Sequence, residues 1–179
     1  GIIDVCINVD HMDPALFDCE IWKKEHLILA VPSDFPVNQK LKEYQLSWEQ
    51  VVSQQFLSDS APAVSLKYFA SEPFLFLKKR SDLYERTLKM CHNAGFEPHI
   101  LLYLDQMLSS YYIAKEGKGI CFIRSQMLSS VKRTDQLCFY KVDDPLSLRN
   151  IFIYYRKNKL QDSVRDFLAF FKDYTDVQA

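Results

Sequence analysis

Two polar residues, Ser81 and Asp105, stand where a helical pattern follows an apolar run, and this placement suits the binding of an anion. Residues 74–77 and 100–104 form the apolar runs, and helical periodicity follows each of them. The free N–H groups in the first turn of a helix favour a negatively charged ligand. Ser and Asp are also preferred N-cap residues, so a purely structural role is the competing interpretation. The carboxylate of Asp105 would oppose an anionic ligand unless a Lys or Arg offset its charge.

Asp82 and Arg124 are further candidates for ligand binding in the same region. Asp82 follows Ser81 directly, and Arg124 follows a third apolar run at residues 120–123. A cation at the end of a strand can reach a bound ligand, although a solvated surface Arg is the commoner situation. A carboxylate such as that of Asp82 also suits the positive end of a helix dipole. Each of the two residues therefore has a structural interpretation beside the functional one.

The sequence lacks the motifs that carry catalysis or metal binding. It contains no Gly-x-Ser-x-Gly elbow, no P-loop and no Gly-x-Gly-x-x-Gly. Gly117-x-Gly119 precedes a strand, which is the wrong context for a dinucleotide fingerprint. Cys91 and His92 are adjacent but have no further ligands at zinc spacing. We therefore expect no enzyme activity, no catalytic residue, no cofactor and no metal.

Strands that alternate with helices must position the candidate residues. The runs at residues 74–77, 100–104 and 120–123 are predicted strands, and the helices between them are predicted to end at Gly95 and Gly117. This alternation predicts a parallel sheet with crossover helices. Ligand sites in such sheets lie at the carboxyl ends of the strands, beside the helix N-termini.

Other elements flank this central unit on both sides. Ser47 and Gln50 have the spacing of a capping box, which predicts a short helix after Ser47. A helical turn is predicted at residues 65–69. The last helix has the clearest apolar stripe, and further strands are predicted from their apolar and β-branched content. The predicted strands are residues 2–9, 20–31, 137–142 and 149–156, and the stripe is Leu160, Val164, Phe167, Leu168, Phe171 and Tyr174.

Composition describes an ordinary globular chain rather than a membrane or nucleic-acid-binding protein. The 179 residues carry a net charge of −1, and 48% of them are hydrophobic, which suits one domain or two small lobes. The densest basic cluster is residues 78–80, too little for the chain to hold DNA by itself. The five Cys are odd in number and form no C-x-x-C pair, so we expect small buried hydrophobes in a reducing compartment. The start shows neither a signal peptide nor an initiator Met, which suggests a fragment.

Six weak motifs occur along the chain in a specific order. Residues 1–7 fit Gly-x-hydrophobic-Asp-hydrophobic-Ala-Ile, and residues 25–36 fit Glu-x-Leu-x-Leu-Val-x-Pro-x-x-His-Pro with Phe35 in place of His. Residues 94–98 fit Ala-Gly-x-x-Pro, and residues 114–120 fit Val-x-x-Gly-x-Gly-hydrophobic. The remaining two are the helix and strand within residues 64–77 and the final strand and helix. In this order, the motifs resemble the effector-binding domain of LysR-type transcriptional regulators.

The resemblance implies an α/β fold like that of type 2 periplasmic binding proteins, with two α/β lobes joined by two crossover strands. Residues 1–32 and 143–179 would belong to lobe I, and residues 33–142 to lobe II, with an insert at about 37–63. The family's domain normally begins roughly 45 residues before Gly1. Lobe I is therefore expected to be incomplete in this chain.

The resemblance also implies a function, which is sensing a small-molecule effector, possibly anionic, in the inter-lobe cleft to modulate transcription. The loop of Asn8, Val9 and Asp10 would line the effector site from lobe I, and Leu104, Asp105 and Gln106 would contact the ligand from lobe II. Ser81, Asp82 and Arg124 complete the expected effector-binding set.

The same resemblance implies a cytoplasmic homodimer or homotetramer with no membrane contact, in which the helix after Ser81 is a candidate dimer surface. DNA would be bound only through a helix-turn-helix domain absent from these residues. The alternative function is a solute-binding protein of a transport system, which would need a signal peptide or lipid anchor. An enzyme of related fold, such as a prephenate dehydratase, is a third interpretation without motif support.

Overall fold

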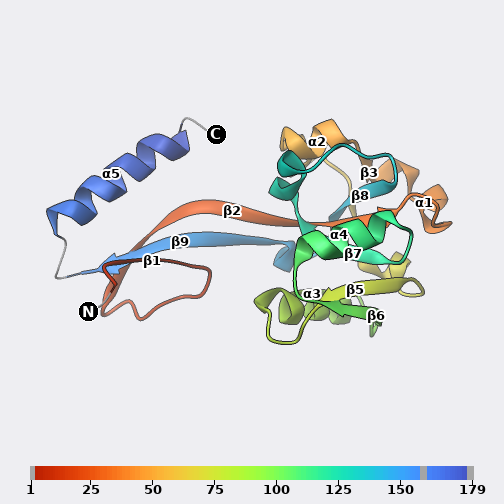
Figure 1. The fold of residues 1–179 in the computed structure, drawn as a ribbon, viewed down its shortest axis with the longest axis horizontal. Helices are drawn as coiled ribbons and strands as arrows, with labels where there is room; N and C mark the ends of the chain where they lie inside the picture. Colours follow the sequence, from red (N-terminus) through yellow and green to blue (C-terminus); the bar gives the residue numbers. More distant parts are fainter. Residues whose placement is uncertain (1–2, 158–160, 177–179) are drawn as a thin grey trace. The chain divides into compact units, whose positions relative to one another are not determined.

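A computed structural model describes residues 3–157 and 161–176 of the chain (Figure 1). It divides into two compact units. Unit 1 comprises Gly1–Glu25 and Arg149–Ala179, and unit 2 comprises His26–Leu148. The chain crosses between the units within β2 (Phe17–Pro32) and at the start of β9 (Leu148–Arg156). The lobe limits given above, including the insert at 37–63, stay predictions.

Unit 2 is built on a mixed sheet that contains the predicted strand–helix alternation. Strand β5 is parallel to both β6 and β7, which confirms the predicted parallel arrangement. The order along the sheet is β2-β7-β5-β6. On the other side of β2 lies β8, and β3 and β4 both pair with β8. The bounds are β3 (Gln45–Leu46), β4 (Ala63–Val64), β5 (Pro73–Leu77), β6 (His99–Leu104), β7 (Ile120–Arg124) and β8 (Leu137–Val142).

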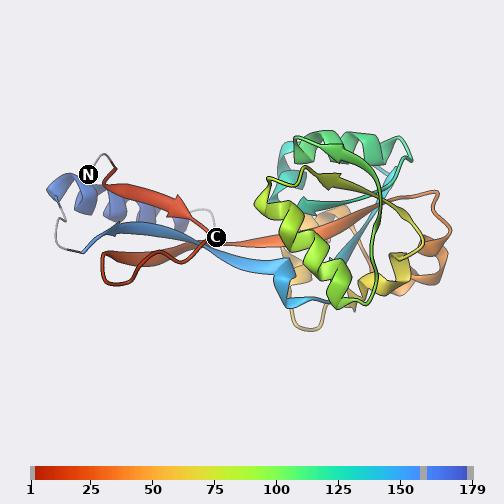
Figure 2. The same cartoon turned by 90° about the horizontal axis from the view of Figure 1, so that it is seen from below.

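Helices cover both faces of this sheet, as expected for strands joined by crossover helices. Helix α3 (Asp82–Asn93) packs on one face and α4 (Met107–Lys115) on the other (Figure 2). Strand β2 shows the two faces clearly, because Leu29 faces the α3 core and Ile28 faces the α4 core, and both are 0% exposed. Side chains of a strand alternate between faces, so its apolar run fills both cores.

The segment between β2 and β5 contributes to these cores. It contains α1 (Val37–Lys40), α2 (Trp48–Val52) and 3-10 turns at Lys42–Tyr44, Gln55–Leu57 and Leu66–Phe69. The last of these turns confirms the prediction at residues 65–69. The buried side chains from this segment include Leu41, Leu46, Val51 and Phe56. Further 3-10 turns lie at Ser125–Ser130 and Pro145–Ser147.

Local signals in the sequence define the helix ends. The capping box is present, since Ser47 Oγ accepts a bond from the Gln50 N–H at 3.1 Å and Gln50 Oε1 accepts one from the Ser47 N–H at 2.7 Å. Gly95 and Gly117 have φ of +87° and +72° just after α3 and α4. Glycine adopts this left-handed conformation without a steric penalty, so both predicted helix ends are confirmed.

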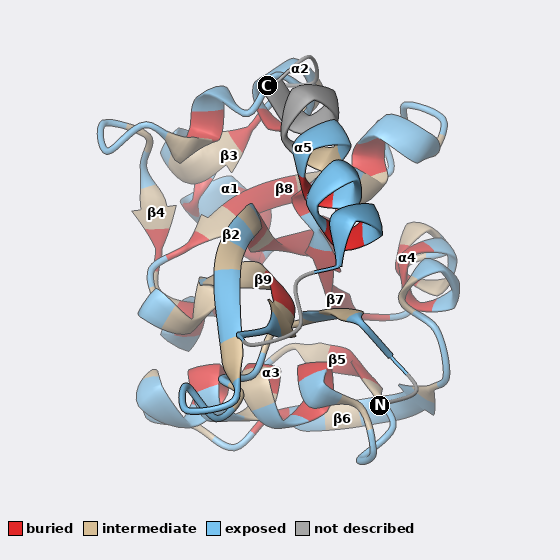
Figure 3. Ribbon diagram, turned by 90° about the vertical axis from the view of Figure 1, so that its left-hand side faces the viewer, coloured by how far each residue is buried: buried red, intermediate tan, exposed pale blue. Residues whose placement is uncertain are grey.

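Unit 1 combines three strand segments with the last helix. Strand β9 lies between β2 and β1 (Val5–Asn8), and β1 is antiparallel to it. In helix α5 (Asp162–Asp176), Val164 and Leu168 are buried, whereas Phe167 is 39% exposed. Figure 3 shows buried and exposed stretches alternating along this helix. The stripe is therefore confirmed at Val164, Leu168 and half-buried Phe171, and the prediction was wrong for Phe167. Leu160 and the side chain of Tyr174 lie outside the described residues.

A buried ion pair joins the two connecting strands within unit 1. Arg149 Nε of β9 lies 2.8 Å from Glu25 Oε1 of β2, and Arg149 Nη2 donates to Glu25 Oε2 at 3.3 Å. The side chain of Glu25 is 4% exposed and that of Arg149 is 19% exposed. The two-pronged geometry satisfies both carboxylate oxygens, which makes the burial of this charge tolerable.

The cysteines differ in their surroundings more than the sequence predicted. All five are free thiols. Cys91 and Cys121 are buried, as expected for small hydrophobes, and Cys6 and Cys138 are half-buried. The prediction was wrong for Cys19, which is exposed because the first half of β2 is solvated on one face. In the described part of the chain, no helix has both the length and the apolar character needed to cross a membrane.

Candidate functional site

The carboxyl ends of the parallel strands β5, β6 and β7 meet at one edge of the unit 2 sheet. The chain leaves β5 at Leu77 and β6 at Leu104, and each exit leads directly into a helix. A backbone hydrogen bond joins the segments that follow β5 and β6, because the N–H of Lys78 donates to the carbonyl of Leu104 at 3.0 Å. Leu104 itself is half-buried and packs on the α4 core, so it holds the edge in position.

A pocket of about 640 Å³ lies at this edge, and its lining includes the predicted residues Ser81 and Asp105. We call it the basic pocket, because Lys78, Lys79 and Arg80 complete the lining. Its volume is in the range of small-molecule sites. The structure therefore brings Ser81 and Asp105 together, as predicted from the strand ends.

The charge of Asp105 is offset by Lys78. The Lys78 Nζ atom lies 2.7 Å from Asp105 Oδ1 and donates to Oδ2 at 2.9 Å. Both side chains are exposed, so the pair is worth little to stability. Lys79 and Arg80 remain as positive charges in the lining, and the pocket has a net positive charge. The objection that Asp105 would repel an anion is therefore met by a neighbouring cation.

Ser81 has the structural role that competed with ligand binding. Its Oγ accepts a hydrogen bond from the Leu83 N–H at 3.2 Å and caps α3, and Asp82 is the exposed first residue of this helix. Asp105 is not a cap. The N-cap position of α4 is held by Gln106, whose side chain makes no capping bond. Asp105 lies one residue too early, and its carboxylate binds Lys78 instead.

The remaining candidates lie outside the basic pocket. Arg124 stands at the exposed end of β7, opposite Leu27 of β2. Asn8, Val9 and Asp10 belong to unit 1, where the Asn8 side-chain oxygen accepts bonds from the N–H groups of Val9 at 2.8 Å and Asp10 at 3.4 Å. This local turn is the Asx geometry that a short Asn often adopts.

Sequence reasoning missed the three cations of the basic pocket as site residues. Lys78, Lys79 and Arg80 were considered only as a weak signal for DNA binding. A signal was present, since they occupy the link between a predicted strand end and a helix N-cap. In α/β sheets, this link is where ligands are held.

Comparisons with known proteins agree with this architecture. A family model described as the LysR substrate binding domain matches residues 50–176. Among curated proteins, none matches the sequence. Solved structures of LysR-type regulators superpose on most of the chain, and their sequence identity is low enough to show the fold alone.

Three of these structures illustrate the likeness. Full-length BenM is 17% identical with a TM-score of 0.67, over 98% of this chain and 52% of BenM. The CcmR regulatory domain of Synechocystis PCC6803, in complex with 2-PG, is 14% identical with a TM-score of 0.71, over 96% of this chain and 73% of that domain. The QuiR effector-binding domain, in complex with shikimate, is 15% identical with a TM-score of 0.65, over 97% of this chain and 72% of that domain.

The chain thus spans about half of full-length BenM and somewhat less than three quarters of the isolated regulatory domains. The shared fold is the α/β architecture of type 2 periplasmic binding proteins. The family model covers most of the chain, including the basic pocket and the connection between the units at the start of β9. The chain belongs to the LysR substrate-binding domain family.

Proposed function

We propose that this chain is the ligand-sensing part of a LysR-type transcriptional regulator. Family membership carries the proposal and indicates that the chain is not an enzyme. A sensor needs a site whose occupation favours one conformation over another. The basic pocket at the strand ends supports such a role in unit 2.

The effector is a small anion, and the charge of the basic pocket supports this choice. Lys79 and Arg80 bring positive charge to the first turn of α3, whose N–H groups favour anions. Lys78 offsets Asp105. Two related domains have been solved with benzoate and with shikimate. Both ligands are carboxylates, and a carboxylate is the charge that Arg binds in a fixed two-pronged geometry.

A thermal-shift screen of small carboxylates tests the proposal. A ligand at about 100 times its dissociation constant stabilises the folded state by about 2.7 kcal/mol. For a chain of this size, that is a rise in melting temperature of roughly 5–11 °C. Benzoate and shikimate are the first probes, followed by phosphorylated acids of similar size.

Two variants locate the bound ligand, and one serves as a control. Arg80→Ala and Lys79→Ala are expected to reduce the shift at fixed ligand concentration, since each removes a charge from the lining. Lys89→Ala removes an exposed charge from α3 outside the pocket and is expected to leave the shift unchanged. If the ligand-induced rise in melting temperature is unchanged in Ser81→Ala, Gln106→Ala, Lys79→Ala and Arg80→Ala, the site assignment is contradicted.

We further propose a cytoplasmic homodimer or homotetramer that reaches DNA only through a separate helix-turn-helix domain. The free thiols agree with a reducing compartment. Strand β6 is last in the sheet order, and its Leu101, Leu102 and Tyr103 are 42–46% exposed. An apolar strand edge of this kind is a surface that proteins normally cover. Light scattering on Leu102→Asp is expected to show smaller particles than the parent chain.

A further inference from the structure

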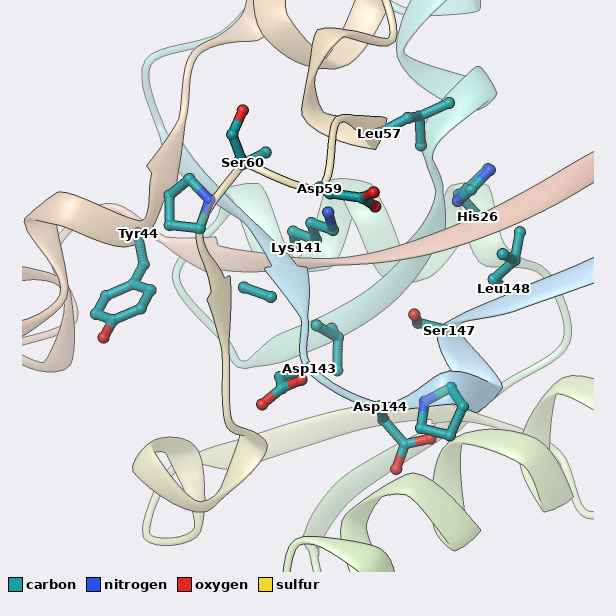
Figure 4. Close-up of a pocket in the computed structure, with 15 residues that line it drawn as sticks. His26, Tyr44, Leu57, Asp59, Ser60, Lys141, Asp143, Asp144, Ser147 and Leu148 are labelled. Atoms are coloured by element: carbon teal, nitrogen blue, oxygen red, sulfur yellow. The ribbon is translucent and has the colours of Figure 1, made fainter.

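A second cavity in unit 2 lies beside both connections to unit 1. Its volume is about 770 Å³, within the range of small-molecule sites. We call it the border cavity, because its lining includes His26, the first residue of unit 2, and Leu148, the last. Figure 4 shows the side chains around it. It shares no lining residue with the basic pocket.

The border cavity presents both signs of charge. Lys141 and Asp59 lie close together on one side, and Asp143 lies on another (Figure 4). Lys141 Nζ donates to the Ser58 carbonyl at 3.0 Å and keeps further donors available. Within the described residues, the carboxylates of Asp59 and Asp143 have no hydrogen-bond or ion-pair partner. Two acceptor groups and one donor group therefore stand ready for a ligand.

Unlike Asp59 and Asp143, Asp144 has both carboxylate oxygens engaged in hydrogen bonds within the protein. One of its oxygens accepts from Asn93 Nδ2 at 2.9 Å, and the other accepts from the Leu146 N–H at 2.8 Å. Its function is therefore structural, although it also lines the cavity. Apolar groups form the rest of the wall, among them Leu57, Val142 and Leu148. The cavity combines an apolar wall with separate cationic and anionic groups.

We propose that the border cavity is a second ligand site, for a small zwitterion with an ammonium group, a carboxylate and an apolar chain. Asp143 binds the ammonium group, and Lys141 binds the carboxylate. The apolar chain packs on Leu57 and Leu148. An amino acid with an aliphatic side chain has this chemistry.

The position of the cavity gives such a ligand a route to regulation. His26 follows Glu25 in β2, and Leu148 precedes Arg149 in β9. Glu25 and Arg149 form the buried ion pair that joins these two strands. A ligand that contacts His26 and Leu148 thus touches both connecting strands one residue from that pair. Occupation of the cavity shifts the sensor only to the extent that it favours one arrangement of these strands.

Equilibrium dialysis with L-leucine tests the proposal on the whole chain. We expect one bound leucine per chain, and isobutyrate and isobutylamine, which each lack one of the charges, to bind at least tenfold more weakly. Asp143→Asn and Lys141→Met are each expected to weaken leucine binding at least tenfold. Ala61→Trp fills the cavity from its lining and abolishes binding, with folding checked by circular dichroism.

The control variant is Lys89→Ala, an exposed charge of α3 that lines neither pocket, and it leaves leucine binding unchanged. The proposal is overturned if leucine and other aliphatic amino acids show no binding at about 10 mM, a concentration at which a site with a dissociation constant of about 1 mM would be about 90% occupied. It is also overturned if Lys79→Ala abolishes binding while Asp143→Asn and Ala61→Trp do not. Failure of this test leaves the carboxylate screen at the basic pocket unaffected, because the two sites share no residue.

Discussion

Replacing Glu25 by Gln measures what the buried ion pair contributes to unit 1. The change keeps the size of the side chain but removes its charge, and so breaks the ion pair with Arg149. Breaking a buried pair by removing one partner costs about 3–5 kcal/mol. Arg149 remains 19% exposed, so water reaches part of its charge and we expect about 3 kcal/mol, the lower end of that range.

The two tryptophans make the assay specific for each unit. Trp22 packs against Phe171 in unit 1, whereas Trp48 packs against Phe139 in unit 2. In a Trp48→Phe background, the urea unfolding curve followed by fluorescence reports on unit 1 alone. Glu25→Gln is expected to lower the free energy of unfolding of this transition by about 3 kcal/mol.

A control variant and a double variant test whether the loss of stability comes from the buried ion pair. The exposed pair of Lys157 and Asp18, also in unit 1, is the matched control, and Asp18→Asn is expected to cost less than about 1 kcal/mol. In the double variant with Met at positions 25 and 149, most of the loss is expected to be recovered, because a buried ion pair can often be replaced by apolar groups. If Glu25→Gln lowers the free energy of unfolding by less than about 1 kcal/mol, the reasoning is refuted, because a contribution that small is typical of an exposed ion pair.

Further predictions concern backbone fit, capping and thiol reactivity. Gly119→Ala is expected to cost about 1–3 kcal/mol in urea unfolding, because a Cβ there would lie 2.9 Å from the carbonyl oxygen of Pro73; an unchanged midpoint would contradict the close approach of the strands. Ser47→Ala removes the capping box of α2 and should cost about 1 kcal/mol, measured by the same unfolding curve. Burial raises the pKa of the Cys91 thiol from 9.0 to about 12, so only about one thiol in 10,000 is a thiolate at pH 8. Iodoacetamide at pH 8 should therefore label exposed Cys19 in the folded chain and Cys91 only in urea; rapid labelling of native Cys91 would contradict its burial.

Local elements of the fold could be predicted from the sequence because their causes are local. The capping box at Ser47 and Gln50 depends on residues three positions apart, and it forms as expected. Gly95 and Gly117 end their helices because glycine tolerates a positive φ. The alternation of apolar runs with amphipathic segments was enough to predict parallel pairing of β5 with its neighbours.

The order of the strands could not be predicted in the same way. Residues 100–104 form an apolar run as continuous as that of β5, yet β6 is at the end of the sheet and leaves Leu101 and Tyr103 almost half exposed. Which strand occupies an edge depends on pairings between distant residues, and an apolar run has the same appearance in either place.

The candidate site was predictable in position but not in composition. The rule that ligands lie at strand ends pointed to Ser81 and Asp105, and the basic pocket contains both. The partner of Asp105 is Lys78, which is 27 residues earlier in the chain. That contact exists only because β5 and β6 are neighbours, so no local pattern revealed it. The same is true of the border cavity, whose lining comes from separate parts of unit 2.

The central claim is that the basic pocket binds a small anion, and amide chemical shifts test it most directly. The chain is titrated with a panel of carboxylates that lack an ammonium group while ¹H–¹⁵N spectra are recorded. For any ligand that binds, we predict that the largest shift changes occur at the N–H groups of residues 79–83, where the cations meet the first turn of α3. Saturable changes that spare these residues and cluster elsewhere would contradict the account, and so would a full panel of carboxylates that leaves the spectrum unchanged.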